Sequence, residues 1–159
     1  MTLRDHVKDI SSWDIKILAT DLSTTVLDEA RAAVYPAEVL RNLDPAVVRK
    51  HFTAVTGPAG TRYKVREELT RMVTIAQLNL LGPWPMQGQF DAIFCRNVMI
   101  YFDRATRSQL VERYINQLRP GGHLMVGHSE SLSGMGAGLQ YVQPATYRRG
   151  GAVAPQTSL

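Results

Sequence analysis

One fourteen-residue string, FDAIFCRNVMIYFD, limits the possible fold of this chain more than any other segment. Its apolar run Ala92–Cys95 is short enough for a buried strand and ends abruptly at Arg96 and Asn97. A second apolar run follows, and Asp103 closes the string with a residue type that caps helices. Ligands of doubly wound α/β proteins bind where strands end and the next helices begin. The string therefore predicts a strand, a helix and, between them, a crevice that contains Arg96, Asn97 and Tyr101.

The composition is that of an ordinary globular protein. With 159 residues the chain is one domain by size and is long enough to bury a core of its own. No stretch approaches about eighteen uninterrupted apolar residues, and the N-terminal segment is too polar for a signal peptide. The single cysteine, Cys95, excludes an internal disulfide and fits a reducing compartment. These features predict a cytoplasmic protein with no membrane-inserted segment.

The net charge of +4 has two interpretations. It can attract an acidic partner, such as nucleic acid or an acidic protein helix. It can also reflect a general preference for arginine, because the arginines are spread along the chain rather than clustered. The second interpretation is favoured, since the chain has no RNP-type aromatic motif, zinc-ligand spacing or basic tract. We therefore expect neither a nucleic-acid partner nor a metal site.

Hydrophobic periodicity predicts strands and helices in alternation. The expected strands are Lys16–Asp21, Tyr63–Arg66, Val73–Leu78, Ala92–Cys95 and His123–Gly127, followed by a hairpin of Leu139–Val142 and Thr146–Arg148. The expected helices are Thr2–Ile10, Thr25–Val34, Asp44–His51 and Arg104–Leu118, and the turn Arg119–Gly122 stops the last of them.

This order predicts an α/β fold whose sheet is mostly parallel and finishes antiparallel. One domain is expected over residues 1–150, with a small β-subdomain inserted at residues 35–72 and a flexible tail at residues 151–159. The turn cluster Thr56–Gly60 and the strand that follows it give the insertion an exposed edge.

Polar residues at the predicted strand ends are candidates for ligand binding, and each has a plainer alternative. Asp21 can accept hydrogen bonds from a ribose diol, or it can cap the next helix. Arg96 needs an anionic or hydrogen-bonding partner, either a ligand carboxylate or an acid of the chain such as Glu130. Tyr101 can line the crevice or lie in the core. Cys95 is interpreted as a buried strand residue rather than a nucleophile, because no histidine stands in a recognisable partner motif.

These residues together resemble the chemotaxis receptor methyltransferases (the CheR family). The resemblance is carried by the string FDAIFCRNVMIYFD, by an acid at a strand end, by an Asn-Leu pair after the next strand and by the segment GHSES around His128. It implies a Rossmann-like class I methyltransferase sheet with an antiparallel C-terminal hairpin, and S-adenosylmethionine as cofactor. It assigns cofactor binding to Asp21, Asn79, Leu80, Arg96 and Asn97, and the catalytic position to Tyr101. Without the resemblance, Asn79 and Leu80 are better interpreted as a turn asparagine and a core leucine. Within the resemblance, His128 is structural or lines the pocket.

The function implied by the resemblance is methyl transfer from S-adenosylmethionine to glutamate side chains of chemoreceptors. The partners would be cytoplasmic receptor helices or a receptor's C-terminal peptide, which some family members bind by adding it as a strand to the inserted β-subdomain. A monomer is expected. An alternative is a non-catalytic module that binds receptor peptide. A methyltransferase for nucleic-acid amines is disfavoured, because such enzymes usually carry an Asn/Asp-Pro-Pro-Tyr motif where this chain has Arg-Asn-Val-Met.

The chain departs from the family pattern in one respect. Family members have a first strand and a glycine-rich acidic loop that cradles the cofactor, whereas no glycine precedes Gly57 here. We therefore expect the first strand and its loop to be missing from this sequence. In the family's sheet that strand lies between the strand ending at Asp21 and the one ending at Arg96, so both would have an unpaired edge.

Overall fold

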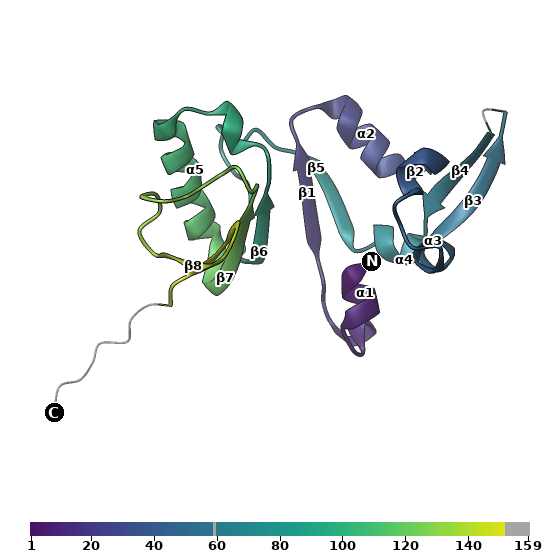
Figure 1. The fold of residues 1–159 in the computed structure, drawn as a ribbon, viewed down its shortest axis with the longest axis horizontal. Coiled ribbons are helices and arrows are strands. Elements are labelled where there is room, and N and C mark those ends of the chain that lie inside the picture. The colour runs from purple at the N-terminus through teal and green to yellow at the C-terminus, as the bar shows by residue number, and fades with distance from the viewer. Residues whose placement is uncertain (59, 152–159) are drawn as a thin grey trace. The chain divides into compact units, whose positions relative to one another are not determined.

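A computed structural model describes residues 1–58 and 60–151 (Figure 1). Two compact units make up the chain, the first spanning Met1–Gly82 and the second beginning at Pro83. Each unit is described by itself below. Both combine helices with β-sheet, which confirms the predicted α/β class. The expected tail lies outside the described residues, apart from Gly151.

The first unit alternates short helices and strands. Its elements are α1 Thr2–His6, η1 Ile10–Ser12, β1 Ile17–Asp21, α2 Thr24–Ala32, β2 Val34–Pro36, η2 Ala37–Leu40, α3 Pro45–His51, β3 Phe52–Gly57, β4 Gly60–Val65, α4 Glu67–Thr70 and β5 Val73–Gln77. Strands β1 and β5 run parallel in a register that pairs Asp21 with Gln77. Helix α2 packs against this pair (Figure 1). The carboxyl ends of β1 and β5 therefore lie at one edge.

A second sheet in this unit has the order β2-β4-β3 and is antiparallel throughout. The sequence predicted only β4 of these strands. Helix α2 begins one residue before the predicted Thr25–Val34 and ends two residues before its predicted end. It ends there because Ala33 adopts a left-handed backbone (φ 50°), and Val34 then begins β2. Strand β2 is stabilised by pairing with β4, which lies farther along the chain. Strand β3 pairs with the next strand, β4, with Gly57 opposite Gly60.

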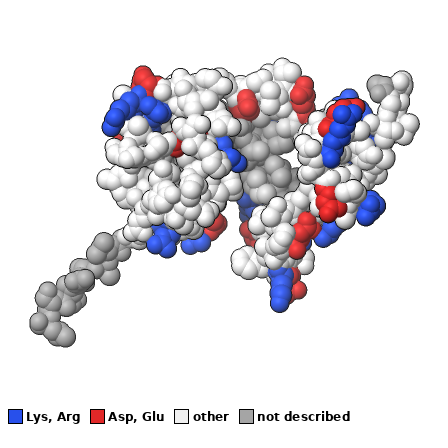
Figure 2. All heavy atoms as spheres, viewed as in Figure 1, with Lys and Arg blue, Asp and Glu red and all other residues white. Residues whose placement is uncertain are grey.

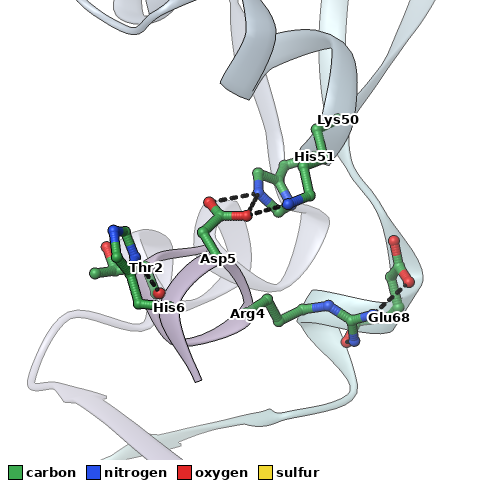
Figure 3. A network of polar contacts seen from close by, with 7 residues as sticks. All are labelled: Thr2, Arg4, Asp5, His6, Lys50, His51 and Glu68. Atoms are coloured by element: carbon green, nitrogen blue, oxygen red, sulfur yellow. Dashed lines mark hydrogen bonds and ion pairs between the residues drawn. The ribbon is translucent and has the colours of Figure 1, made fainter. Parts of the chain in front are cut away.

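A polar network joins α1 to α3 (Figure 3). The Asp5 carboxylate contacts His51 Nε2 at 3.0 and 3.1 Å and forms an ion pair with Lys50. His51 is only 1% exposed. Arg4 of the same helix forms an ion pair with Glu68 at 2.9 Å. The first residues of the chain are thereby attached to segments about 45 to 64 residues later.

The second unit holds one four-stranded sheet and one long helix. Its elements are β6 Phe90–Cys95, η3 Met99–Tyr101, α5 Arg104–Gln117, β7 Leu118–Val126, β8 Leu139–Gln143 and β9 Thr146–Arg149, in the sheet order β6-β7-β9-β8. Strands β6 and β7 are parallel, while β9 is antiparallel to both β7 and β8. This confirms the predicted parallel strands and the antiparallel hairpin that follows them.

One predicted turn is wrong. The segment Arg119–Gly122, expected to be a turn between helix and strand, lies inside β7. The register between β6 and β7 shifts there, with Phe90 opposite Leu118 but Ala92 opposite His123. A Cβ at Gly122 would lie 3.1 Å from two carbonyl oxygens of β6, so the glycine lets the two backbones approach closely.

The core of the second unit forms under α5. Leu110, Val111 and Tyr114 of this helix are buried, and so is Leu118 at the start of β7. Asp103 caps the helix by accepting the Thr106 N–H at 2.8 Å. The helix thus begins where the sequence predicts and packs against β7 (Figure 1).

The two parallel pairs belong to separate sheets. Among the described residues, β1 pairs only with β5, and β6 pairs only with β7. Each of β1 and β6 therefore has one edge without a β partner in the described part of the chain. In these residues no helix has the length and apolar character needed to cross a bilayer.

Candidate functional site

Asp21 ends β1 with an exposed carboxylate. Its Oδ1 accepts the Ser23 backbone N–H at 2.8 Å, and Ser23 caps α2 by accepting the Val26 N–H. The alternative that Asp21 itself caps the helix is therefore wrong. Oδ2 has no hydrogen-bond partner among residues 1–58 and 60–151, so one carboxylate oxygen is available for a hydroxyl donor.

Asn79 and Leu80 follow the neighbouring strand. The Leu78 N–H donates to the Asp21 carbonyl at 3.0 Å, which brings the start of this segment to the end of β1. The Asn79 side-chain oxygen accepts the Leu81 N–H at 3.0 Å, so this residue shapes a turn. Leu80 is half-buried. The structure thus gathers Asp21, Asn79 and Leu80 at one end of the β1–β5 pair.

Arg96 directly follows β6 in the second unit and is exposed. Its guanidinium Nη2 lies 3.4 Å from His128 Nδ1, at the end of the adjacent strand β7. In the part of the chain that the structure describes, no carboxylate pairs with it. The alternative pairing with Glu130 is therefore wrong. Arg96 presents a cation that can bind a carboxylate of a ligand.

Glu130 is occupied by backbone groups. Its Oε2 accepts the N–H groups of Asn97 (2.9 Å) and Gly127 (2.6 Å), and its Oε1 accepts those of Val98 (2.9 Å) and Ile100 (3.2 Å). Burial raises the pKa of this carboxyl, but the N–H groups of Gly127 and Asn97 outweigh it and the net pKa is lowered. Glu130 is thus a buried carboxylate that stays ionised.

Asn97 adopts a left-handed backbone with φ 60°, which asparagine tolerates better than most residues. Its side-chain oxygen lies close to Gly127, where an added Cβ would come within 2.6 Å of it. The Asn97 side chain therefore lies against the end of β7. The structure brings Asn97 and Arg96 together beside that strand end.

Tyr101 is 81% exposed at the end of η3. The alternative that it is a core aromatic is therefore wrong. Its neighbour Met99 is fully buried and anchors the short helix instead. The phenol is available to a substrate.

Cys95 is buried, as predicted. The Tyr114 hydroxyl donates to its Sγ at 3.1 Å. Burial raises the pKa of the Cys95 thiol, so the thiolate form is disfavoured at neutral pH. Cys95 is a packing residue and not a nucleophile.

Charged side chains elsewhere are mixed in sign. Figure 2 shows Lys and Arg beside Asp and Glu on the face drawn. Ion pairs such as Arg31–Asp28 and Arg71–Glu67 account for part of this mixing. Among the described residues, no group of three or more His, Cys, Asp or Glu side chains could hold a metal ion.

Sequence reasoning missed what holds the Arg96 loop. The sequence indicates Glu130 only as a possible partner for Arg96, and Gly127 only as the end of a strand. The segment GHSES directly after a strand is the signal that marks both residues, but which donors converge on the glutamate depends on the pairing of β6 with β7.

Comparison with known proteins identifies the family to which the chain is similar. The family described as "CheR methyltransferase, SAM binding domain" matches residues 1–147. The chain is 45% identical over 135 residues to a chemotaxis protein methyltransferase of Escherichia coli (strain K12), covering 84% of this chain and 46% of that protein. It is 40% identical over 151 residues to a chemotaxis protein methyltransferase of Borreliella burgdorferi, covering 94% and 52%. A probable chemotaxis protein methyltransferase of Rhizobium etli is 39% identical, covering 84% and 50%.

Among solved structures, the N-methyltransferase NodS from Bradyrhizobium japonicum WM9 is similar, with a TM-score of 0.49 and 13% identity, covering 85% of this chain and 74% of that one. The chain spans about half the length of the curated relatives it matches. Because the family match covers nearly the whole chain, this protein belongs to the CheR methyltransferase family, and the part matched is the domain that binds S-adenosylmethionine.

Proposed function

We propose that this chain is the catalytic portion of a methyltransferase that transfers methyl groups from S-adenosylmethionine to glutamate side chains of chemoreceptors. The observation that carries the proposal is the exposed Arg96 at the end of β6, which has no carboxylate partner in residues 1–58 and 60–151. A cation in that position suits the carboxylate of the cofactor's methionine group. The names of the relatives point to chemotaxis as the setting. The proposal takes the protein to act as a cytoplasmic monomer.

The residues present fit the cofactor. Asp21 has one carboxylate oxygen available for a ribose hydroxyl. Asn79 and Leu80, at the same end of the β1–β5 pair, offer an amide and an apolar face to adenine. Arg96 and Asn97 are assigned to the methionine end of the cofactor.

The reaction makes few chemical demands on the protein. S-adenosylmethionine supplies a methyl group on a positively charged sulfur, and the products are a methyl ester and a neutral thioether. A glutamate side chain is already ionised at neutral pH, so no general base is required. The protein has to align the reacting groups and exclude water. We assign Tyr101 to the substrate carboxylate, because its exposed hydroxyl can orient that group and its ring can wall the site.

Binding of the cofactor product form tests the proposal directly. S-adenosylhomocysteine titrated into the purified chain by calorimetry is expected to bind with micromolar affinity. The variant Arg96→Ala should weaken binding about 10- to 100-fold, since a hydrogen bond to a charged group contributes about 1.5–3 kcal/mol. Asp21→Ala should weaken it about tenfold.

Arg119→Ala is the matched control. Arg119 is also exposed, and it pairs with Asp91 on the surface. This variant should bind S-adenosylhomocysteine as the unaltered chain does. Equal losses in Arg96→Ala and Arg119→Ala, or no binding by the unaltered chain, would contradict the proposed cofactor role.

A second candidate function is a peptide-binding module without catalysis. It is favoured by strand β3, which pairs only with β4 among the described strands and can accept an added strand along its other edge. A groove of about 440 Å³ beside it is lined by Thr53, Val55 and the segment Lys64–Glu68. Binding of a receptor C-terminal peptide without any binding of S-adenosylhomocysteine would favour the module over the enzyme.

A further inference from the structure

The loop that follows β6 has no regular structure of its own until η3. Its first hydrogen bond between nearby backbone groups is the one from the Tyr101 N–H to the Val98 carbonyl at 3.2 Å. The N–H groups of Asn97, Val98 and Ile100 all donate to Glu130, a residue at least 30 positions later in the chain. The shape of the loop is therefore set from outside the loop.

The carboxylate of Glu130 is fully used. A carboxylate offers about four lone-pair positions, and here each oxygen accepts two backbone N–H groups. Backbone N–H groups that converge in this way form an anion-binding site, and a side chain of the same protein fills it. No acceptor position is left for Arg96, and its guanidinium is available to another anion.

Gly127 makes this arrangement possible. A Cβ at this position would lie 2.6 Å from Glu130 Oε2 and 2.6 Å from Asn97 Oδ1. The Glu130 N–H in turn donates to the Gly127 carbonyl at 2.9 Å, which closes a tight turn at the end of β7. That turn also carries His128, the neighbour of Arg96. One turn after β7 thus holds the loop after β6 and contacts its arginine.

We propose that Glu130 is a positioning residue: by gathering four backbone N–H groups it fixes the loop that presents Arg96, Asn97 and Tyr101 to cofactor and substrate. The inference rests on the proposed function, because it concerns how the same loop is held. Glu130 itself touches neither cofactor nor substrate. It acts as an ionised acceptor, a state that its lowered pKa supports.

Amide hydrogen exchange tests the arrangement without any ligand. The amides of Asn97, Val98, Ile100 and Gly127 should exchange slowly in the unaltered chain, although Asn97 and Val98 lie in the loop and Ile100 lies in the short η3. Rapid exchange of these amides in the folded protein overturns the proposal. This measurement needs no variant, so it stands even if substitution of Glu130 prevents folding.

The variant Glu130→Gln tests the charge. It keeps the size of the side chain but replaces one acceptor oxygen by an NH₂ group, which cannot accept from two N–H donors. Exchange should become at least about tenfold faster at the amides of the loop and of Gly127, while the Leu124 amide in β7 keeps its rate. Unchanged exchange at the loop amides overturns the proposal. Glu112 is an exposed glutamate on α5, and Glu112→Gln is the matched control. This variant should leave the exchange rates of the loop amides, of Gly127 and of Leu124 unchanged.

Ligand affinity separates positioning from a merely structural role. At a temperature where circular dichroism shows Glu130→Gln to be folded, its affinity for S-adenosylhomocysteine should fall about tenfold, while Glu112→Gln binds normally. Faster loop exchange with unchanged affinity overturns the positioning role. If the unaltered chain does not bind S-adenosylhomocysteine, the proposed function fails, and the exchange measurements alone decide whether Glu130 holds the loop.

Discussion

At the scale of single residues, two carboxylates each bind groups from segments that are distant in the sequence. Asp5 contacts His51 and Lys50 in the first unit, and Glu130 holds the loop after β6 in the second. In both cases hydrogen-bond donors stabilise the charged form, and the pKa is lowered. Each carboxylate therefore stabilises the folded chain only while it is ionised.

Gly127→Ala is expected to destabilise the second unit. The added Cβ would lie 2.6 Å from Glu130 Oε2 and from Asn97 Oδ1, so one of these groups must shift. Overpacking of this kind costs about 1–3 kcal/mol, measurable by urea denaturation. Gly88→Ala is the control, because nothing lies within 4 Å of its Cβ position, and it should change the free energy of unfolding by no more than about 0.5 kcal/mol. Equal stability of the two variants would contradict the close approach.

Asp5 is expected to make the first unit sensitive to acid. Hydrogen bonds from Lys50 and His51 lower its pKa from 3.8 to about 2. Because the folded-state pKa is the lower one, the stabilisation is present above pH 3.8 and is lost as the pH falls towards about 2. Asp5→Asn should flatten the pH dependence of the urea midpoint in this window. Asp28→Asn, which breaks an exposed ion pair with Arg31, should keep the slope.

At the scale of elements, helix starts are local and could be read from the sequence. Asp44 and Asp103 both accept a backbone N–H from the first turn of the helix they precede. Ser23 does the same for α2. A cap depends on residues two or three positions apart, so sequence patterns capture it. Strand β2 escaped prediction because its partner β4 lies farther along the chain. Strand β3 is next to β4 in the chain, but its residues after Phe52 are exposed, so it has no buried apolar face.

Leu110→Ala is expected to destabilise the α5–β7 layer. Leu110 is 1% exposed and belongs to the buried face of the helix. Truncation of a buried leucine costs about 2–5 kcal/mol, which urea denaturation would detect. Gln109→Ala, on the exposed face of the same helix, should change stability by no more than about 0.5 kcal/mol. A small loss for Leu110→Ala would show that this face is not part of the core.

At the scale of the whole molecule, each of the two units carries some of the residues proposed to bind cofactor or substrate. Asp21, Asn79 and Leu80 belong to the first, whereas Arg96, Asn97 and Tyr101 belong to the second. A ligand that binds only the folded state stabilises whatever it contacts, by about 2.7 kcal/mol at a concentration 100 times its Kd. Bound ligand is therefore expected to slow amide exchange at the residues assigned to it.

S-adenosylhomocysteine should accordingly slow amide exchange at the ends of β1 and β5 and also at the ends of β6 and β7. Hydrogen exchange followed by mass spectrometry, with and without ligand, checks this. Adenosine alone is the control and should slow exchange only in the first unit, because it lacks the amino acid assigned to Arg96. Unchanged exchange at the ends of β1 and β5 would contradict the assigned role of Asp21, and unchanged exchange at the ends of β6 and β7 would contradict that of Arg96.

The sequence by itself determined the α/β class, the positions of the main strands and helices, and the family, because periodicity, caps and the string FDAIFCRNVMIYFD are all local. Only the tertiary structure decided that Asp21 is not a cap, that Tyr101 is exposed, and that Glu130 binds backbone N–H groups instead of Arg96. These outcomes depend on which strand ends lie side by side. Hydrogen bonds between residues 30 or more positions apart exist only once the parallel pairing of β6 and β7 has formed.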